Sequence, residues 1–140
     1  MFSRSRLGCC ALLIALASQT PSPRAMQQDA GVAGSIAVRT ADVNGVKLQY
    51  LTAGHGPAIV LLHGYAETSR MWRSLIPRLA TKVTVIAPDL PGIGGSDIPR
   101  DGLDMTPAAI RIHDLVKGLG IEKAVVAGHD IRLMVASPWR

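Results

Sequence analysis

The feature of this sequence that most limits its fold is a series of short apolar runs without polar alternation. Ala58–Leu62 reads AIVLL, and similar runs cover Lys82–Pro88 and Glu122–Ala127. Such runs are typical of strands that are covered on both faces. Segments with helical periodicity separate them, and this alternation predicts an α/β fold: a mostly parallel sheet with helices on both sides.

The helical segments carry recognisable start and stop signals. The first has one apolar face, made of Trp72, Leu75, Ile76 and Leu79. Thr68 or Ser69 is a suitable cap for it, and Pro77 should kink or restart the helix. A second helix is expected to begin at Thr106–Pro107 and to stop at Gly120.

A hairpin is predicted ahead of these units. Ile36–Val43 and Val46–Leu51 are strand-like and are joined by Asn44-Gly45, a strong signal for a tight turn. In the second run Lys47 and Gln49 alternate with apolar residues. One face of that strand should therefore be exposed to solvent, which suits a strand at the edge of the sheet.

Length and composition allow one modest domain. The chain has 140 residues, 48% of them hydrophobic and 18% charged, which argues against disorder. Arg4 and Arg6 precede an apolar run, Leu7–Ala17, that ends in a small-residue cleavage signal. We expect residues 1–17 to be a signal peptide, 18–34 a flexible lead-in, and 35–140 a partial α/β domain that is exported to the periplasm or secreted.

The expected leader also limits the partners. Its apolar run is shorter than the roughly 20 residues that span a bilayer, so no stable membrane insertion is expected after cleavage. Cys9 and Cys10 both lie in it, which leaves no cysteine for disulfides or metal binding. Loss of Arg4 and Arg6 lowers the formal net charge from +5 to +3, and the remaining charges are scattered. Nucleic-acid binding therefore has no support, and no metal or cofactor is predicted.

Candidate chemistry lies in the loops that follow the strands, because ligands bind at the carboxyl ends of parallel strands. These loops are His63–Glu67, Asp89–Asp97 and Gly128–Ile131. In the last, Asp130 stands between a strand and the helix expected to start at Ile131. So tight a turn exposes its central side chain above the sheet. A carboxylate there can displace at a saturated carbon, opening an epoxide or expelling a halide.

These motifs, Gly128-His129-Asp130, His63-Gly64 after a strand, and the DLPGIGGSD loop that begins at Asp89, occur in an order that resembles the α/β-hydrolase superfamily. The resemblance covers about residues 37–136 and is to the epoxide hydrolase and haloalkane or haloacetate dehalogenase branch. It implies the N-terminal half of that fold. It also implies a small-molecule substrate and no cofactor.

The resemblance assigns roles to individual residues. Asp130 is the implied nucleophile, and the backbone amides of Tyr65 and Ile131 are the implied oxyanion hole. His63 and Gly64 are expected to support the first loop, Asp89 to hold the glycine-rich loop by hydrogen bonds, and Gly128 to allow the tight turn.

Simpler interpretations compete with these roles. An aspartate after a strand is often only a helix cap, and the companion motifs favour the nucleophile. His63 could be a base but is interpreted as a brace for its loop, and His129 as a packing residue. Gly92–Gly95 could suggest a dinucleotide fingerprint, but Asp97 stands where its third glycine would be.

Three departures from the family pattern are visible. Arg132 stands where the turn needs a small residue, and Ala66 where proline is frequent. In the resembled family a lid, an acid and a catalytic histidine follow the elbow helix, and none has a counterpart before Arg140. We therefore expect a truncated or frame-disrupted copy, inactive in turnover because no histidine activates water.

The functional alternatives remain open at this point. An epoxide hydrolase is favoured, since the loop at His63-Gly64-Tyr65 lacks an asparagine that a halide-binding dehalogenase would place there. A haloacid or haloalkane dehalogenase, a non-catalytic small-ligand-binding protein on the same fold, and a non-functional fragment are the alternatives. Oligomeric state and substrate identity are not determined by the sequence.

Overall fold

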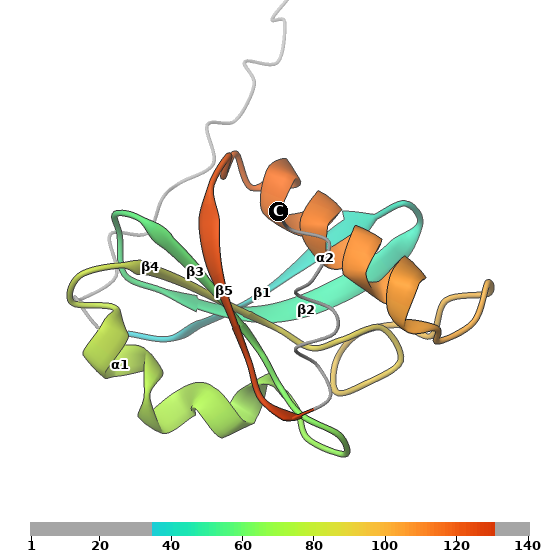
Figure 1. Cartoon of the computed structure of the whole chain (residues 1–140), viewed down its shortest axis with the longest axis horizontal. Helices are drawn as coiled ribbons and strands as arrows, with labels where there is room; N and C mark the ends of the chain where they lie inside the picture. The colour runs from blue at the N-terminus through green and yellow to red at the C-terminus, as the bar shows by residue number, and fades with distance from the viewer. Residues whose placement is uncertain (1–34, 131–140) are drawn as a thin grey trace, which may run out of the picture.

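The computed structural model describes residues 35–130, which form five strands and three helical segments (Figure 1). The strands are β1 (Ala37–Val43), β2 (Val46–Ala53), β3 (Ala58–Leu62), β4 (Thr84–Pro88) and β5 (Ala124–Gly128). The helices are the 3₁₀ segment η1 (Ser69–Ser74), α1 (Ile76–Leu79) and α2 (Met105–Gly118). The predicted signal peptide, the lead-in and the helix expected from Ile131 lie outside the described residues.

The strands form one mixed sheet in the order β1-β2-β4-β3-β5. The pairings of β3 with β4 and with β5 are parallel, whereas β1 with β2 and β2 with β4 are antiparallel. The sheet is therefore less parallel than predicted, because the hairpin contributes both antiparallel pairings. The prediction that the second hairpin strand is an edge was wrong, since β2 lies between β1 and β4.

The hairpin turn is as expected from its two residues. Asn44 and Gly45 have φ angles of 53° and 78°, the left-handed pair that a two-residue turn between twisted strands needs. Gly45 also donates its backbone N–H to the Asp42 carboxylate at 2.9 Å. The turn fixes the register of β1 on β2 from Ala37↔Thr52 to Val43↔Val46.

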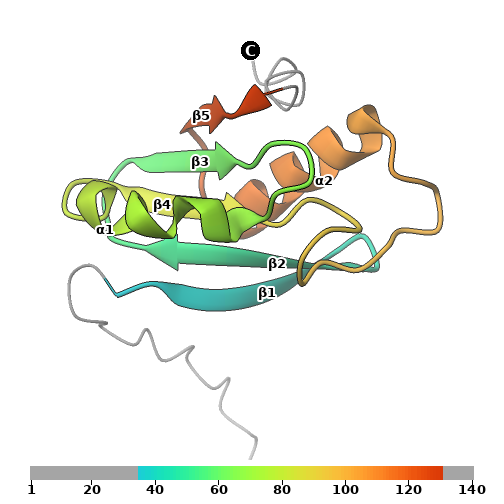
Figure 2. The ribbon, with the colours of Figure 1, turned by 90° about the horizontal axis from the view of Figure 1, so that it is seen from below.

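The two faces of the sheet are buried under different helices (Figure 2). On one face, α2 contributes Ile112 and Leu115 to a core that includes Leu62. On the other, α1 contributes Ile76 to a core that includes Leu61. Neighbouring residues of β3 thus enter opposite cores, which is why its sequence shows no polar alternation.

The helix boundaries differ from prediction at one place. Thr68 caps η1, its hydroxyl accepting the Arg70 N–H at 3.3 Å, and Pro77 lies in the first turn of α1, so the helix restarts there as predicted. The second helix begins at Met105 with Asp104 at the N-cap, two positions before the predicted first residue Pro107 and cap Thr106. Proline fits anywhere in a first turn because no intrahelical bond is lost there.

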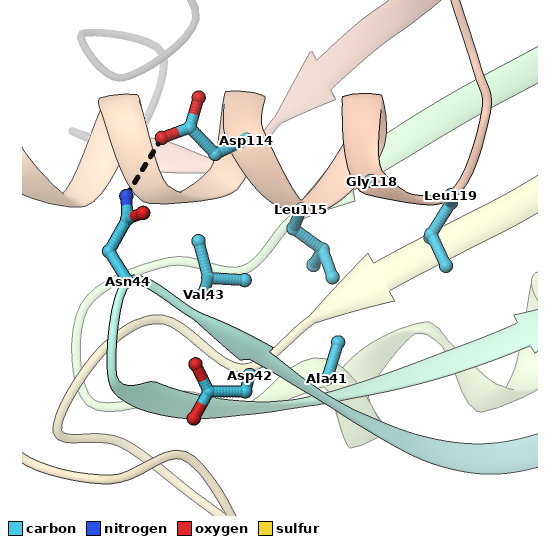
Figure 3. A pocket seen from close by; sticks show the side chains of 8 residues that line it. All are labelled: Ala41, Asp42, Val43, Asn44, Asp114, Leu115, Gly118 and Leu119. Carbon is cyan, nitrogen blue, oxygen red and sulfur yellow. Dashed lines mark hydrogen bonds between the residues drawn. The ribbon is translucent and has the colours of Figure 1, made fainter.

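Helix α2 is also tied to the hairpin. The Asn44 side chain donates a hydrogen bond to Asp114 at 3.0 Å across a hollow of about 220 Å³ (Figure 3). Val43 and Leu115 point into this hollow, and Gly118 lies at its rim. In the described part of the chain, no helix has the length and apolar character needed to cross a membrane.

Candidate active site

Asp130 lies just after β5, at the carboxyl edge of the sheet. Its backbone has a conformation that is rare for a residue with a side chain. The His129 N–H donates to the Leu62 carbonyl at 3.0 Å, so β5 stays paired with β3 up to this point. Asp130 then has a φ of 59° and an exposed side chain. Non-glycine residues rarely adopt positive φ, and such strained residues concentrate at functional sites.

The loop between β3 and η1 lies against Asp130. A Cβ atom placed on Gly64 would be 3.4 Å from the Asp130 Cβ and 2.8 Å from the His129 Nδ1. Only a residue without a side chain allows this approach. Gly64 is buried, and the next residue, Tyr65, exposes 73% of its surface. The structure thus brings Gly64 and Asp130 together, while Ile131, the other expected amide donor, lies outside the described residues.

Glu67 joins these two loops and was missed in the sequence analysis. Its carboxylate accepts the Gly64 N–H at 3.1 Å and lies 3.4 Å from His129 Nδ1, an ion pair when the imidazole is protonated. Its own N–H donates to the Gly64 carbonyl at 3.4 Å. The spacing of three residues between Gly64 and Glu67 was the available signal, because a carboxylate can close a tight turn at that distance.

His63 is fully buried and connects the same loop to the end of β4. The Leu90 N–H donates to His63 Nε2 at 3.1 Å, so this nitrogen carries no proton. Nδ1 then holds the proton and donates it to the Gly64 carbonyl at 3.0 Å. With its Nε2 lone pair occupied and no exposed surface, the ring is placed to hold the loop rather than to activate water.

Asp89 is the second buried polar residue of this edge. The residue is 1% exposed, and its carboxylate accepts hydrogen bonds from Ser69 N at 2.7 Å, Gly95 N at 2.9 Å and Gln49 Nε2 at 3.0 Å. Burial alone raises the pKa of Asp89, but these hydrogen bonds together outweigh it and hold the pKa below its ordinary value. One ionised carboxylate therefore connects β2, η1 and the glycine-rich loop.

The turn at Ala66 differs from the turn that proline would make there. Ala66 has a φ of 56°, whereas the proline ring fixes φ near −65°. The conformation of this loop is thus closed by Glu67 rather than by a proline. Arg132, the other departure seen in the sequence, lies outside the described residues.

The fold and this arrangement of loops can be compared with known proteins. The family model described as alpha/beta hydrolase fold matches residues 57–131, more than half of the chain. This chain belongs to that family. The matched segment of this α/β hydrolase runs from the residue before β3 through the position after Asp130.

Individual relatives indicate the branch of the α/β-hydrolase family to which this chain is similar. The soluble epoxide hydrolase of Corynebacterium sp. (strain C12) is 47% identical over 88 residues, which cover 63% of this chain and 31% of that protein. The fluoroacetate dehalogenase of Burkholderia sp. is 36% identical over 97 residues, covering 66% of this chain and 32% of that protein. The chain therefore spans about a third of the length of these curated relatives.

A solved structure agrees with the sequence comparison. The epoxide hydrolase CorEH without ligand superimposes with a TM-score of 0.70 at 44% identity, covering 73% of this chain and 36% of that one. The sheet and helices described above are thus the N-terminal portion of an α/β-hydrolase domain, of the epoxide hydrolase and dehalogenase type.

Proposed function

We propose that this α/β hydrolase acts on epoxides through Asp130, forming an ester between its carboxylate and the substrate. The observation that carries the proposal is the exposed Asp130 carboxylate, held at positive φ directly beside Gly64. The likeness to a soluble epoxide hydrolase supports the choice of substrate class.

The first chemical step needs only the carboxylate and an electrophilic carbon. An oxygen of Asp130 bonds to one epoxide carbon, and the bond between that carbon and the ring oxygen breaks. The ring oxygen keeps the electron pair and takes a proton from a nearby acid or from water. The product is a hydroxyalkyl ester on Asp130.

The second step regenerates the carboxylate and requires a base that activates water, a role for which no described residue is proposed. A water oxygen bonds to the ester carbonyl carbon, and the resulting oxyanion is stabilised by backbone N–H donors, for which we propose Tyr65 and Ile131. The alkyl oxygen then leaves and takes one of the two water protons, which releases a diol, and the other proton returns to the acid of the first step or to solvent. His63 and Gly64 keep the Tyr65 loop in place through the contacts described above.

A dehalogenase is the second candidate, favoured by the likeness to a fluoroacetate dehalogenase. The same Asp130 oxygen would displace halide from the carbon beside a carboxylate, and hydrolysis of the ester would release a hydroxy acid. Both candidates require a covalent ester at the same residue, and a non-catalytic ligand-binding protein requires none.

Mass spectrometry of peptides after incubation with an aryl epoxide, and separately with a haloacetate, tests these candidates. We expect one adduct on the Asp130 peptide, formed faster with the epoxide. Asp130→Asn should abolish it, whereas Asp97→Asn, which changes another exposed aspartate of the same sheet edge, should not. Reading the Asp130 peptide separates this adduct from alkylation of Cys9 or Cys10. An unmodified Asp130 peptide with both reagents would contradict the nucleophile.

We also propose that the protein is exported, on the basis of the charged start and apolar run in residues 1–17. Fusion of residues 1–34 to a reporter that is active only outside the cytoplasm should give signal. Replacing Arg4 and Arg6 by glutamate should reduce export, because the positive start orients a signal peptide.

A further inference from the structure

Gln49, in the middle of β2, bonds to the end of β4 and the loop after it through three separate groups. Its N–H donates to the Ser96 hydroxyl at 3.0 Å, and its carbonyl accepts the Asp89 N–H at 2.8 Å. Its side-chain Nε2 donates to Asp89 Oδ2 at 3.0 Å. The Ser96 hydroxyl in turn donates to the Asp89 carbonyl at 2.7 Å.

We propose that Gln49 is a positioning residue that fixes, through Asp89, the loop that carries the Tyr65 amide. The inference rests on the proposed function, because it concerns the oxyanion hole assigned above. Gln49 does not touch the reacting atoms in this scheme. Its effect is on where the β3–η1 loop lies relative to Asp130.

The connection runs through the two oxygens of one carboxylate. Gln49 and Gly95 bind Asp89 Oδ2, while Asp89 Oδ1 accepts the Ser69 N–H at 2.7 Å. Because a carboxylate is a rigid plane, a change in the partners of Oδ2 also turns Oδ1. Ser69 is fully buried and follows the loop 64–68 directly, so it anchors the C-terminal end of that loop.

The N-terminal end of the same loop is anchored independently. His63 bonds to Leu90, the residue after Asp89, and Gly64 contacts both Glu67 and Asp130. The loop is thus held at both ends by neighbouring residues at the end of β4. Gln49 is the β2 residue that orients one of these two anchors.

The glycine-rich loop packs closely against Gln49 and Asp89. A Cβ atom on Gly95 would collide with the carboxamide of Gln49, and one on Gly94 would collide with the Asp89 carboxylate. The glycines at 94 and 95 therefore let the loop lie directly against the Gln49 carboxamide and the Asp89 carboxylate. The alternation of Gln49 with apolar residues predicted that its side chain faces solvent, so this role was not anticipated from the sequence.

The first test observes the loop itself. Gln49→Met keeps the length of the side chain and removes the donor, and Lys47→Met is the matched control. Lys47 lies on the same face of β2, is 55% exposed and contacts Asp97 instead of Asp89. We expect the NMR amide signals of Ser69 and Tyr65 to shift, and their hydrogen exchange to accelerate, in Gln49→Met alone. Unchanged signals would overturn the proposal. Gln49→Glu, which places a carboxylate beside Asp89, should shift the same two signals and serves if the methionine variant does not fold.

The second test separates positioning from general stability. An epoxide first forms the Asp130 ester, and hydroxylamine then cleaves it: nitrogen bonds to the carbonyl carbon, the carbon–oxygen bond breaks, and the alcohol leaves with a proton. The oxyanion hole acts only in this cleavage. We expect Gln49→Met to leave the alkylation rate unchanged and to slow cleavage about tenfold, since a small misplacement of a donor weakens its stabilisation.

Equal slowing of both steps, or of neither, would contradict a positioning role for Gln49. Absence of any Asp130 adduct in the unchanged protein would instead contradict the proposed function. In that case the amide signals of Ser69 and Tyr65 still decide whether Gln49 holds the loop.

Discussion

Asp89 and Asp130 each follow a strand, at the same edge of the sheet, and the structure holds them in opposite ways. Asp89 is buried and accepts three N–H hydrogen bonds from three different segments. Asp130 is exposed and strained at a φ of 59°, and no described residue donates a hydrogen bond to its carboxylate. A carboxylate whose acceptor sites are filled organises loops, whereas an exposed one can reach a substrate. The position of an aspartate after a strand therefore does not assign its role.

The largest effect expected from this comparison is at Asp89. Asp89→Ala leaves three N–H donors without this acceptor, of which the Ser69 N–H is buried and the other two are part-buried, and should lower the free energy of unfolding by about 2–3 kcal/mol. Asp97→Ala, at an exposed aspartate of the same loop, should change it by less than about 1 kcal/mol. Urea denaturation measures both. Similar losses in the two variants would show that the Asp89 network is not what stabilises this edge.

The pH dependence of stability provides a second measurement. Because the folded-state pKa of Asp89 is lowered, its ionisation stabilises the fold fully above the unfolded-state pKa of about 3.9. This contribution is lost as the pH falls through the lower folded-state pKa. The difference in stability between the unchanged protein and Asp89→Asn should therefore shrink below about pH 4. A difference that stays constant from pH 7 to pH 3 would contradict the lowered pKa.

At Asp130 the expected effect on stability is smaller and has the opposite sign. Asp130→Gly relieves the positive φ and should raise the free energy of unfolding by about 0.5–1 kcal/mol, while removing the epoxide adduct. Asp130→Asn should remove the adduct with little change in stability, since asparagine also tolerates this conformation. Destabilisation by glycine would mean that the Asp130 side chain supports the turn, as Asp89 supports its own loop.

The smallest expected effect, at Gly118, measures how much a glycine in ordinary helical conformation lowers the free energy of unfolding. Gly118 ends α2, has no positive φ, and a Cβ there would meet no atom within 4 Å. Gly118→Ala should therefore stabilise the protein by up to about 0.5 kcal/mol, by reducing the freedom of the unfolded chain. Glycine would then be preferred at 130 and alanine at 118, each for its φ angle. A loss of stability in Gly118→Ala would contradict this account.

Most of the fold could be predicted because it follows from local patterns. The bounds of β3, the Asn44-Gly45 turn and the restart at Pro77 all depend on residues that are neighbours in sequence. The place of β2 could not be predicted in this way, since alternating polarity does not show whether solvent or a folded loop covers the polar face. In the structure the glycine-rich loop covers Gln49.

The site was predicted unevenly for the same reason. The sequence indicated which loops meet at the carboxyl edge, because strand ends converge there. It did not indicate that Glu67 joins Gly64 to His129, or that Gln49 binds Asp89, 40 positions along the chain. Such bonds depend on the register of the sheet and on glycines that allow close approach.

The pairing of β5 with β3 also has a consequence for the order in which the molecule assembles. Ala58 pairs with Ala124, 66 positions along the chain, whereas β3 and β4 pair across 26 positions, from Ala58 to Thr84. Closing the longer loop costs more conformational entropy. The pairing of β5 with β3 therefore becomes favourable only after the intervening segments have ordered. During synthesis on the ribosome, Asp130 is thus the last of the described residues of this edge to arrive, and it follows a strand that pairs with β3 after β4 has already paired with the other side of β3.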